Sequence, residues 1–357
     1  MLKVCFPFVG DSIGGSHKST MLLIEGLDRS IFSPLVVLHT EGPLATFLKE
    51  KAIAYELLPL STMAGSEPSL LNFFLAQLRN YKILLEFIRK WQIDIVHTND
   101  LRCNLSWGLV SRIHAQHVWH QRTVMSRAFL WRMIGLLTNY VICISDTVLN
   151  TYRSFASVRV LTNPFRTHNQ DRSVAKHALI TELNLDPSQL LVGIVGRLVP
   201  RKGLDIIGQL TVYLPPEVSL VVIGDGPLRD ALPVTVHKLG FRDPIEPVIA
   251  GLDVLITLSL EEGFGRVVVE GMLAGTPVVA SDIPAHREIT GNGQYAILVS
   301  PQDPKAVANA IRELLTDKEK NSMYVKTSFE FARHSYSQAA HVKGVEEIYK
   351  NLKGAHL

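Results

Sequence analysis

Two glutamates in the segment EEGFGRVVVEGMLAGTPVVAS, residues 261–281, have the types and spacing of a ligand-binding pair. Glu262 stands in a glycine-flanked turn, and Glu270 lies eight positions later, a little over two turns into a helix that begins at Gly265. Both carboxylates can then face one side of that helix from different depths. Because a carboxylate accepts two hydrogen bonds from neighbouring hydroxyls, this spacing favours the diols of two sugar rings.

The turn between these glutamates offers backbone groups as well as carboxylates. A glutamate at a helix start is most often a favourable partner for the helix dipole. The flanking glycines favour a ligand instead, because glycine permits a tight turn and close approach to the backbone. The amides at the helix start would then hold an anion between the two sugars. The amides of this predicted anion site are those of Phe264, Gly265, Arg266 and Val267, and Gly263 belongs to the same predicted donor site.

A second motif, GIVGRLVPRKG at residues 193–203, places two cations after a buried strand. Arg197 follows the strand directly, and Lys202 precedes a glycine that we expect to open a helix. An arginine fork binds phosphate oxygens in pairs, and a lysine adds a mobile point charge, so the motif favours a diphosphate. Two solvated surface cations are the alternative, and the motif alone leaves both open.

Glycines and histidines mark further strand ends in the first half of the chain. The loop GDSIGGSHKST carries Gly14 and Gly15, but its spacing matches neither a Walker loop nor a dinucleotide fingerprint. His120, with Arg122 two positions on, is placed to hydrogen-bond a sugar hydroxyl. A plain strand-to-helix turn and a structural histidine are the respective alternatives.

The elements that must position these residues alternate along the chain. Short Val- and Ile-rich runs such as residues 3–9, 93–99 and 116–121 alternate with helix-length segments, which predicts βαβ units and a parallel sheet. A polar stretch after Asn163 interrupts this alternation of apolar runs and helix-length segments, which then resumes. We therefore expect an α/β protein with two doubly wound, Rossmann-like domains, at residues 1–165 and 166–335. Two such domains facing each other would form a cleft at the carboxyl ends of their strands.

Composition narrows the classes of function. The chain has 357 residues, 47% of them hydrophobic, with a net charge of +3 and three cysteines. These values favour a folded enzyme in a reducing cytoplasm and predict no nucleic-acid partner, disulfide or structural zinc. No uncharged stretch has the length of a membrane span. The segment at residues 127–137 mixes arginines with large apolar residues, so peripheral contact with a membrane and a partly buried domain helix both stay open.

Together these motifs resemble the large retaining glycosyltransferase family numbered 4, which has the GT-B fold. The resemblance covers nearly the whole chain and includes VHTND, GRLVPRKG, VIGDGPLR, the two-glutamate segment and a last helix, FARHSYSQAAHVKGVEEIYKNL. It implies that the chain crosses back at this helix and that residues 336–357 pack on the first domain. It also implies that Arg197 and Lys202 bind the donor diphosphate, that Glu262 binds the transferred sugar and that Glu270 binds the ribose.

The resemblance implies roles for a few more residues. His120 would contact the sugar near its 6-hydroxyl, Gly15 would approach the phosphates, and the segment with Phe241 and Arg242 would hold the base. The chain departs from the family pattern in having Arg242 where a glycine is usual. It also reads Thr257-Leu258-Ser259 before the glutamate turn and Asn163-Pro164 at the hinge.

We therefore expect a metal-independent transferase that moves a hexose of the glucose type from a UDP-sugar, such as UDP-glucose, with retention. The acceptor would be a saccharide or lipid-linked saccharide in polysaccharide or glycoconjugate biosynthesis. No cofactor is expected, because the two cations supply the charge that a metal ion supplies elsewhere and the chain has no Asp-x-Asp pair. A nucleotide-sugar epimerase and a non-catalytic nucleotide-sugar-binding protein are the alternatives, whereas a dinucleotide oxidoreductase lacks its glycine fingerprint.

Overall fold

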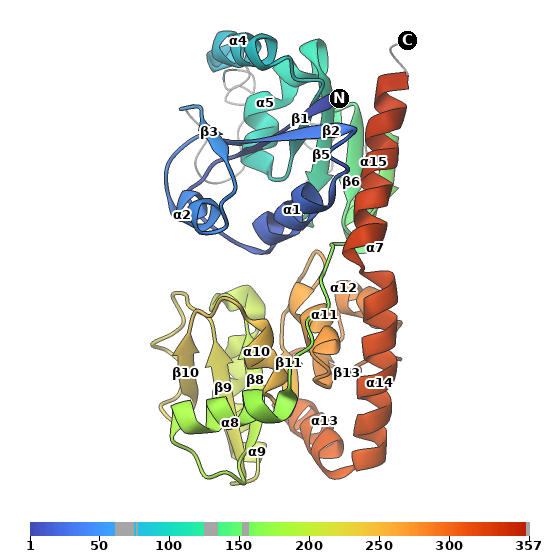
Figure 1. Cartoon of the computed structure of the whole chain (residues 1–357). Coiled ribbons are helices and arrows are strands. Elements are labelled where there is room, and N and C mark those ends of the chain that lie inside the picture. The colour runs from blue at the N-terminus through green and yellow to red at the C-terminus, as the bar shows by residue number, and fades with distance from the viewer. Residues whose placement is uncertain (61–74, 76–77, 125–134, 152–156, 355–357) are drawn as a thin grey trace. The chain divides into compact units, whose positions relative to one another are not determined.

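The chain folds into two compact units of α/β structure. The computed structural model describes residues 1–60, 75, 78–124, 135–151 and 157–354 (Figure 1). Unit 1 comprises Met1–Pro164 together with Gln338–Leu357, and unit 2 comprises Phe165–Ser337. Each unit has a parallel sheet and a core of its own.

Unit 1 is built on a parallel sheet of seven strands in the order β3-β2-β1-β4-β5-β6-β7. Its strand order reverses between β1 and β4, which is the switch point where ligands of such sheets bind. The strands are β1 (Leu2–Phe8), β2 (Phe32–Leu38), β3 (Tyr55–Leu57), β4 (Ile95–Thr98), β5 (Gln116–Gln121), β6 (Tyr140–Cys143) and β7 (Ser157–Val160). The described helices are α1 (Gly15–Gly26), α2 (Pro43–Glu50), α4 (Tyr81–Trp91), α5 (Leu101–His114), α7 (Asp146–Thr151) and α15 (Gln338–Gly354).

The final helix, α15, completes the core of unit 1. Its residues Val345 and Tyr349 are fully buried and belong to the same apolar cluster as Phe6 and Phe32. It packs against α1 so closely that a Cβ at Gly26 would come within 2.6 Å of the side chain of Val342. In Figure 1 it is the red helix beside α1. The last residues of the chain are therefore structural members of the first unit.

Unit 2 repeats the architecture with six parallel strands in the order β10-β9-β8-β11-β12-β13. Its central strands are buried on both sides by helices, so they read as continuous apolar runs. The strands are β8 (Leu190–Val195), β9 (Val218–Ile223), β10 (His237–Gly240), β11 (Val254–Thr257), β12 (Val278–Ser281) and β13 (Ile297–Val299). The helices are α8 (Arg172–Leu183), α9 (Ile207–Tyr213), α10 (Glu246–Ala250), α11 (Arg266–Leu273), α12 (Pro284–Ile289), α13 (Pro304–Thr316) and α14 (Lys318–Ser335), with 3₁₀ turns at Pro200–Lys202 and Leu204–Ile206.

The predicted fold class of two parallel-sheet, Rossmann-like domains is confirmed by these topologies. The sequence patterns missed two strands, β7 and β10, both at sheet edges. The first, SVRV, is largely exposed, and the second, HKLG, is half-buried. An edge strand that is not covered on both faces needs no continuous apolar run, so hydrophobic patterning does not reveal it.

Two expected helices differ in the structure. The predicted final helix is two helices, because Tyr336 leaves the helical conformation and Ser337 instead bridges to Phe165. The helix expected near Gly203 begins as a 3₁₀ turn, Leu204–Ile206, with Gly203 as its N-cap residue, and this turn leads directly into α9 at Ile207. Gly203 has a left-handed φ of 63°, and a Cβ there would lie 2.1 Å from the carbonyl oxygen of Leu258. This close approach brings the Lys202 loop against the end of β11.

Candidate functional site

The two predicted phosphate-binding cations lie at the carboxyl end of β8. Arg197 follows the strand, and the Lys202 stem passes over Gly196, where a Cβ would be 3.5 Å from Lys202 Cε. Both line a small cavity whose other wall is formed by residues 257–259, at the end of β11. The structure thus brings together two neighbouring strand ends that are about 60 positions apart in sequence.

Glu262 is held by two partners at this cavity. Its Oε1 pairs with the Lys202 ammonium and accepts a hydrogen bond of 2.9 Å from the Ser259 hydroxyl. Burial raises the pKa of Glu262, but the charge and hydrogen bond of Lys202, with the Ser259 hydroxyl, outweigh it and keep the pKa below its usual value. The carboxylate is therefore ionised and oriented, which suits a hydrogen-bond acceptor and not a general acid.

Glu270 has a cation of its own. It lies on α11 and accepts a 3.2 Å hydrogen bond from Arg266, one helical turn earlier. The Arg266 guanidinium lies 4.2 Å from the ring centroid of Phe165, a cation–π contact. Both side chains are less than a fifth exposed. The two predicted diol-binding carboxylates are therefore both ion-paired within unit 2, each to a different cation.

The turn before α11 has the backbone geometry that the glycines predicted. Gly265 is the N-cap residue and has a positive φ of 92°. A Cβ there would lie 2.9 Å from the ring of His286. Phe264 is buried between the rings of Phe165 and Tyr336, so its side chain anchors the turn and leaves only its backbone for a ligand. Gly263 and Val267 flank this anchored segment on either side.

Three site residues were missed by the sequence patterns. Besides Ser259, the structure adds Ser281, whose hydroxyl donates to the Ser259 carbonyl at 2.5 Å, and His286, whose Nδ1–H donates to the Ser281 carbonyl at 2.9 Å. Burial lowers the pKa of His286, so the ring under Gly265 is neutral. The position of His286 shortly after the strand TPVVAS was the available signal, by the rule that placed the other motifs at strand ends.

The predicted base-binding residues lie at the edge of the same sheet. Phe241 follows β10 and is 63% exposed, so its ring is available for stacking. Arg242 pairs with Glu182 of α8. Their grouping with the donor site stays a prediction.

In unit 1 the predicted residues lie around the switch point of the sheet. Gly14 is the N-cap residue of α1, and apart from its chain neighbours no described residue comes within 4 Å of the place a Cβ would take; Gly15 begins the helix. His120, near the end of β5, is fully buried and not exposed as a ligand contact would suggest. Arg122 reaches from the same strand end to Asn99, after β4, at 3.0 Å. Arg122 also donates to the Thr20 hydroxyl of α1 at 3.4 Å, so α1 and the residues at the ends of β4 and β5 contribute to one polar cluster.

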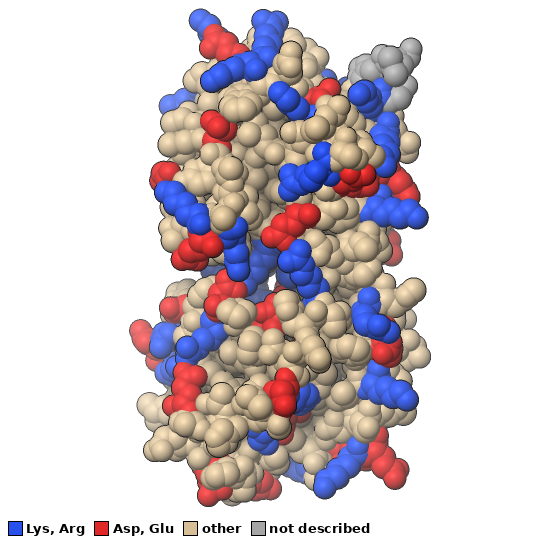
Figure 2. Space-filling view, in the orientation of Figure 1, with Lys and Arg blue, Asp and Glu red and all other residues tan. Residues whose placement is uncertain are grey.

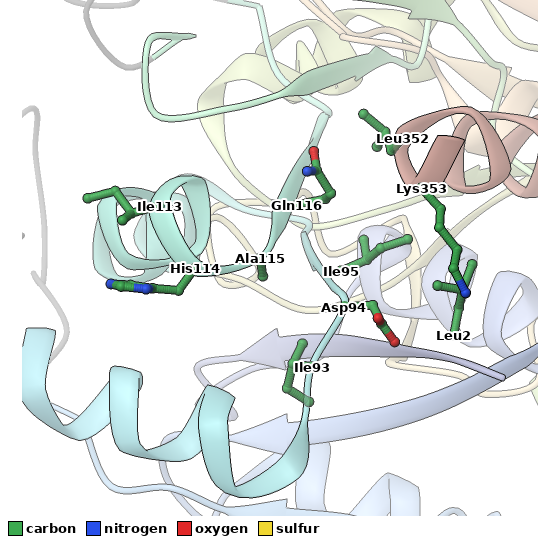
Figure 3. A pocket seen from close by; sticks show the side chains of 10 residues that line it. All are labelled: Leu2, Ile93, Asp94, Ile95, Ile113, His114, Ala115, Gln116, Leu352 and Lys353. Carbon is green, nitrogen blue, oxygen red and sulfur yellow. The ribbon is translucent and has the colours of Figure 1, made fainter. Parts of the chain in front are cut away.

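A separate cavity of about 310 Å³ lies at the opposite edge of this sheet. Figure 3 shows side chains from the amino ends of strands β1, β4 and β5, with Asp94 and Lys353 as its charged groups. No residue predicted to bind the donor lines it. This cavity is distinct from both polar clusters.

Other predicted features are found as follows. Cys5, Cys103 and Cys143 are free and buried. Within the described ranges, no three His, Cys, Asp or Glu side chains are grouped so that they could hold a metal ion. The helices of that same part of the chain include none with the length and hydropathy to cross a bilayer. On the face in Figure 2, basic and acidic side chains are interspersed. The segment proposed for membrane contact, residues 127–137, lies mostly outside the described residues.

Residues 189–317 match the family described as glycosyl transferases group 1. This range contains both predicted cations and both predicted glutamates. The chain is also similar to an uncharacterised glycosyltransferase of Methanocaldococcus jannaschii, with 24% identity across 93% of this chain and 99% of that protein. With the D-inositol 3-phosphate glycosyltransferase of Xylanimonas cellulosilytica it shares 32% identity, across 41% of this chain and 38% of that protein.

The fold is that of solved glycosyltransferases. The crystal structure of Anabaena HepE in complex with UDP and glucose superposes with a TM-score of 0.83, at 22% identity and across 98% of this chain and 100% of that one. WaaG, a glycosyltransferase involved in lipopolysaccharide biosynthesis, superposes with a TM-score of 0.69 at 15% identity, across 97% and 99% of the two chains. The GT-B fold class is therefore confirmed. The chain carries a glycosyl transferases group 1 domain and has glycosyltransferase homologues along nearly its whole length.

Proposed function

We propose that this protein is a retaining glycosyltransferase of family 4 that moves a hexose of the glucose type from a UDP-sugar to an acceptor hydroxyl. The observation that carries the proposal is the Lys202–Glu262 pair at the ends of β8 and β11, beside Arg197. It puts a cation suited to a diphosphate in contact with a carboxylate suited to sugar hydroxyls. One donor molecule that contains both groups would satisfy this arrangement.

In the proposed reaction the acceptor oxygen forms a bond to the anomeric carbon as the bond from that carbon to the diphosphate oxygen breaks. The acceptor proton passes to a phosphate oxygen on the same face of the sugar, which retains the anomeric configuration. Arg197 and Lys202 stabilise the negative charge that develops on the leaving diphosphate. Glu262 orients the sugar through its hydroxyls and transfers no proton.

The comparisons support the choice of donor and acceptor class. HepE has been crystallised with UDP and with UDP-glucose. An Escherichia coli relative, 22% identical across 90% of each chain, is named as a galactosyltransferase that uses UDP-Gal and a diphosphoundecaprenol-linked acceptor. We propose by analogy a saccharide or lipid-linked saccharide acceptor, polysaccharide or glycoconjugate assembly as the pathway, and a cytoplasmic protein that contacts the membrane peripherally.

The Lys202→Ala variant tests the diphosphate role. Removing one preorganised charge from the leaving group should lower kcat by about 10²-fold, measured as UDP release from UDP-glucose with an acceptor saccharide. Lys176→Ala is the matched control, because it removes a lysine that is paired with Asp253 at the other end of β11. It should leave kcat unchanged. Wild-type turnover in Lys202→Ala would contradict the proposal.

Metal independence is proposed because Arg197 and Lys202 supply two positive charges at the diphosphate. UDP release in the presence of excess EDTA should equal the rate without it. Loss of the activity on chelation, and its return with added magnesium, would show that the two cations are insufficient.

A further inference from the structure

A series of buried hydrogen bonds in unit 2 runs from His286 to Glu262 across two neighbouring strand ends. Ser281 is the last residue of β12, and Ser259 lies just after β11, the strand beside it. The Ser281 hydroxyl lies 2.5 Å from the carbonyl oxygen of Ser259, whose own hydroxyl lies 2.9 Å from Oε1 of Glu262. Nδ1 of His286 lies 2.9 Å from the Ser281 carbonyl oxygen and 3.2 Å from the Ser281 hydroxyl. Both serines and the histidine are fully buried, so water does not compete for these bonds.

The direction of each bond in this series is determined by groups that can only accept. A carbonyl oxygen has no proton, so the Ser281 hydroxyl donates its single proton to the Ser259 carbonyl. Toward His286 the same hydroxyl can then only accept, and so can the Ser281 carbonyl. Nδ1 of His286 therefore carries a proton. Because burial lowers the pKa of His286 and keeps its ring neutral, Nε2 has no proton.

This second nitrogen of His286 has no hydrogen-bond partner. Within the residues that the structure describes, Nε2 is buried and meets no donor, and a Cβ at Gly265 would lie 3.1 Å from it. A buried polar atom without a partner costs free energy, and an apolar side chain in this place would avoid that cost. Packing beneath Gly265 alone therefore does not explain a histidine here. The hydrogen bonds of Nδ1 to Ser281 supply the reason.

The peptide group between Ser259 and Leu260 is held on both of its sides. Its carbonyl accepts from Ser281. Its N–H points the opposite way, as in every trans peptide, and donates to the Arg201 carbonyl at 2.9 Å, in the loop that carries Lys202. If the carbonyl lost its donor, rotation of the peptide toward another donor would break the bond to Arg201. The Ser281 hydroxyl thus fixes the orientation of this peptide and, with it, the direction of the Ser259 side chain.

Glu262 depends on the Ser259 hydroxyl because its other partner has a second task. The Lys202 ammonium pairs with the same Oε1 of Glu262, but in the proposed reaction it also binds the leaving diphosphate. A hydroxyl has one proton, so Ser259 donates to Glu262 alone. While a donor molecule is bound, the orientation of the carboxylate therefore rests chiefly on Ser259.

We infer that Ser281 and His286 are positioning residues for Glu262. They hold the peptide after Ser259 so that the Ser259 hydroxyl keeps the carboxylate in one orientation. Neither Ser281 nor His286 touches a ligand in this scheme. Their effect on catalysis rests on the proposed transferase function, whereas their effect on the Glu262 carboxylate does not.

The Ser281→Ala variant tests the inference. With one hydrogen bond of the series lost, kcat should fall roughly tenfold, measured as UDP release from UDP-glucose with an acceptor saccharide. UDP binding in calorimetric titration should stay nearly unchanged, because Glu262 is proposed to bind the sugar. The pKa of Glu262, from ¹³C spectra of glutamate-labelled protein, should rise, since the ionised carboxylate loses a well-placed donor.

Three results for Ser281→Ala would overturn the inference. The first is wild-type kcat together with a wild-type pKa of Glu262. The second is a lower kcat with an unchanged pKa of Glu262, because Ser281 would then act by another route. The third is a loss of UDP binding as large as the loss of kcat, which would indicate a general disturbance of unit 2.

Thr276→Val is the matched control for Ser281→Ala. It removes another fully buried hydroxyl, which donates to the Ile249 carbonyl at 2.8 Å and lies just before β12, at the opposite end of that strand. Both variants should lose stability to a similar extent in urea denaturation. Only Ser281→Ala should change kcat and the pKa of Glu262. An equal fall of kcat in Thr276→Val would show that lost stability, and not positioning, lowers the activity.

Two variants of His286 separate its hydrogen bond from its packing. His286→Asn and His286→Leu both remove the ring beneath Gly265, but only asparagine keeps an N–H on a nitrogen bonded to Cγ, as Nδ1 is. His286→Asn should therefore have the higher kcat and the lower pKa of Glu262. Equal values in the two variants would overturn the role of Nδ1.

Nuclear magnetic resonance tests the series without any turnover. In ¹⁵N spectra of histidine-labelled protein, the His286 signal, identified by its loss in His286→Asn, should show the proton on Nδ1 alone. A proton on Nε2 instead would overturn the inference. A wild-type protein that releases no UDP from any UDP-sugar contradicts the proposed function alone. A raised pKa of Glu262 in Ser281→Ala with unchanged kcat would support the positioning and contradict the role proposed for Glu262.

Discussion

Glu262 and Glu270 look alike in sequence but differ in what holds them. Glu262 is fixed by Lys202 and Ser259 at a strand end, whereas Glu270 is paired along α11 with Arg266. The first pairing joins a carboxylate to Lys202, whose side chain we predict to bind the diphosphate. The second joins one to Arg266, of which only the backbone amide belongs to the predicted anion site. We therefore propose that Glu262 binds the reacting sugar and Glu270 binds the ribose, as two separable roles.

Glutamine at each position tests this division at the residue scale. Glu270→Gln should weaken UDP binding about tenfold in calorimetric titration, because a ribose hydrogen bond to a charged group is lost. Glu262→Gln should leave UDP binding nearly unchanged and lower kcat with UDP-glucose by a similar or larger factor. Glu313→Gln, which breaks the exposed pair with Lys320, is the control for both measurements. Equal loss of UDP binding in both site variants would disprove the separate assignments.

At the scale of elements, the site depends on loops that pack tightly at strand ends. The Lys202 loop is anchored to the loop after β11, where the Leu260 amide donates to the Arg201 carbonyl at 2.9 Å. The turn before α11 lies directly on His286 of α12. Such contacts fix the charged side chains before a ligand arrives, which reduces the reorganisation needed during the reaction.

The Gly265→Ala variant measures how strongly the turn is constrained. The left-handed φ and the 2.9 Å approach to His286 should together cost about 2 kcal/mol or more of unfolding free energy, measured by urea denaturation with circular dichroism. Gly208→Ala in α9 is the control, since its Cβ would meet nothing nearer than 3.7 Å. It should be neutral or stabilise by about 0.5–1 kcal/mol. Equal stability of the two variants would show that the turn relaxes freely.

At the scale of the whole molecule, the two units differ in their buried histidines. Burial lowers the pKa values of His39, His117 and His341 to about 4, and it also lowers those of His97 and His120 well below their usual range, all in unit 1. Among the histidines described in unit 2, the one with a lowered pKa is His286. Acid sensitivity should therefore be concentrated in unit 1.

The sign of the pH dependence follows from the lowered values. Below about pH 6.5 these histidines bind protons in the unfolded chain but not in the folded chain. Their contribution to the free energy of unfolding is therefore complete above that pH and is lost as the pH falls toward about 4. Each such histidine should cost on the order of 1–2 kcal/mol at pH 5. All four tryptophans lie in the sequence of unit 1, so their fluorescence reports its unfolding.

We expect the urea midpoint from tryptophan fluorescence to fall markedly between pH 7 and pH 5. Between pH 8 and pH 7 it should stay nearly constant, which is the internal control, because those histidines are neutral in both the folded and unfolded states there. A midpoint that is unchanged at pH 5 would mean that the buried histidines accept protons without loss of structure.

Much of this protein follows from its sequence alone. Apolar runs bounded by glycine and polar residues predicted the central strands, because a strand buried on both faces must be apolar throughout. The sequence also predicted that Arg197, Lys202, Glu262 and Glu270 bind a ligand, because they lie in segments that follow buried strands, where such sheets bind their ligands, and this assignment stays a prediction. Edge strands such as β7 were not predicted, since a partly buried strand needs no continuous apolar run.

Only the tertiary structure decided which of these residues meet. The partners of Glu262 include a lysine 60 positions away, and His97 meets a tyrosine 252 positions away. Such pairs depend on strand order and on where α15 packs. The local sequence around each residue does not determine a partner so far away in the chain. The sequence determined which side chains can bind charge and hydroxyl groups. The packing of sheets and helices determined their partners, their protonation and the direction of their hydrogen bonds.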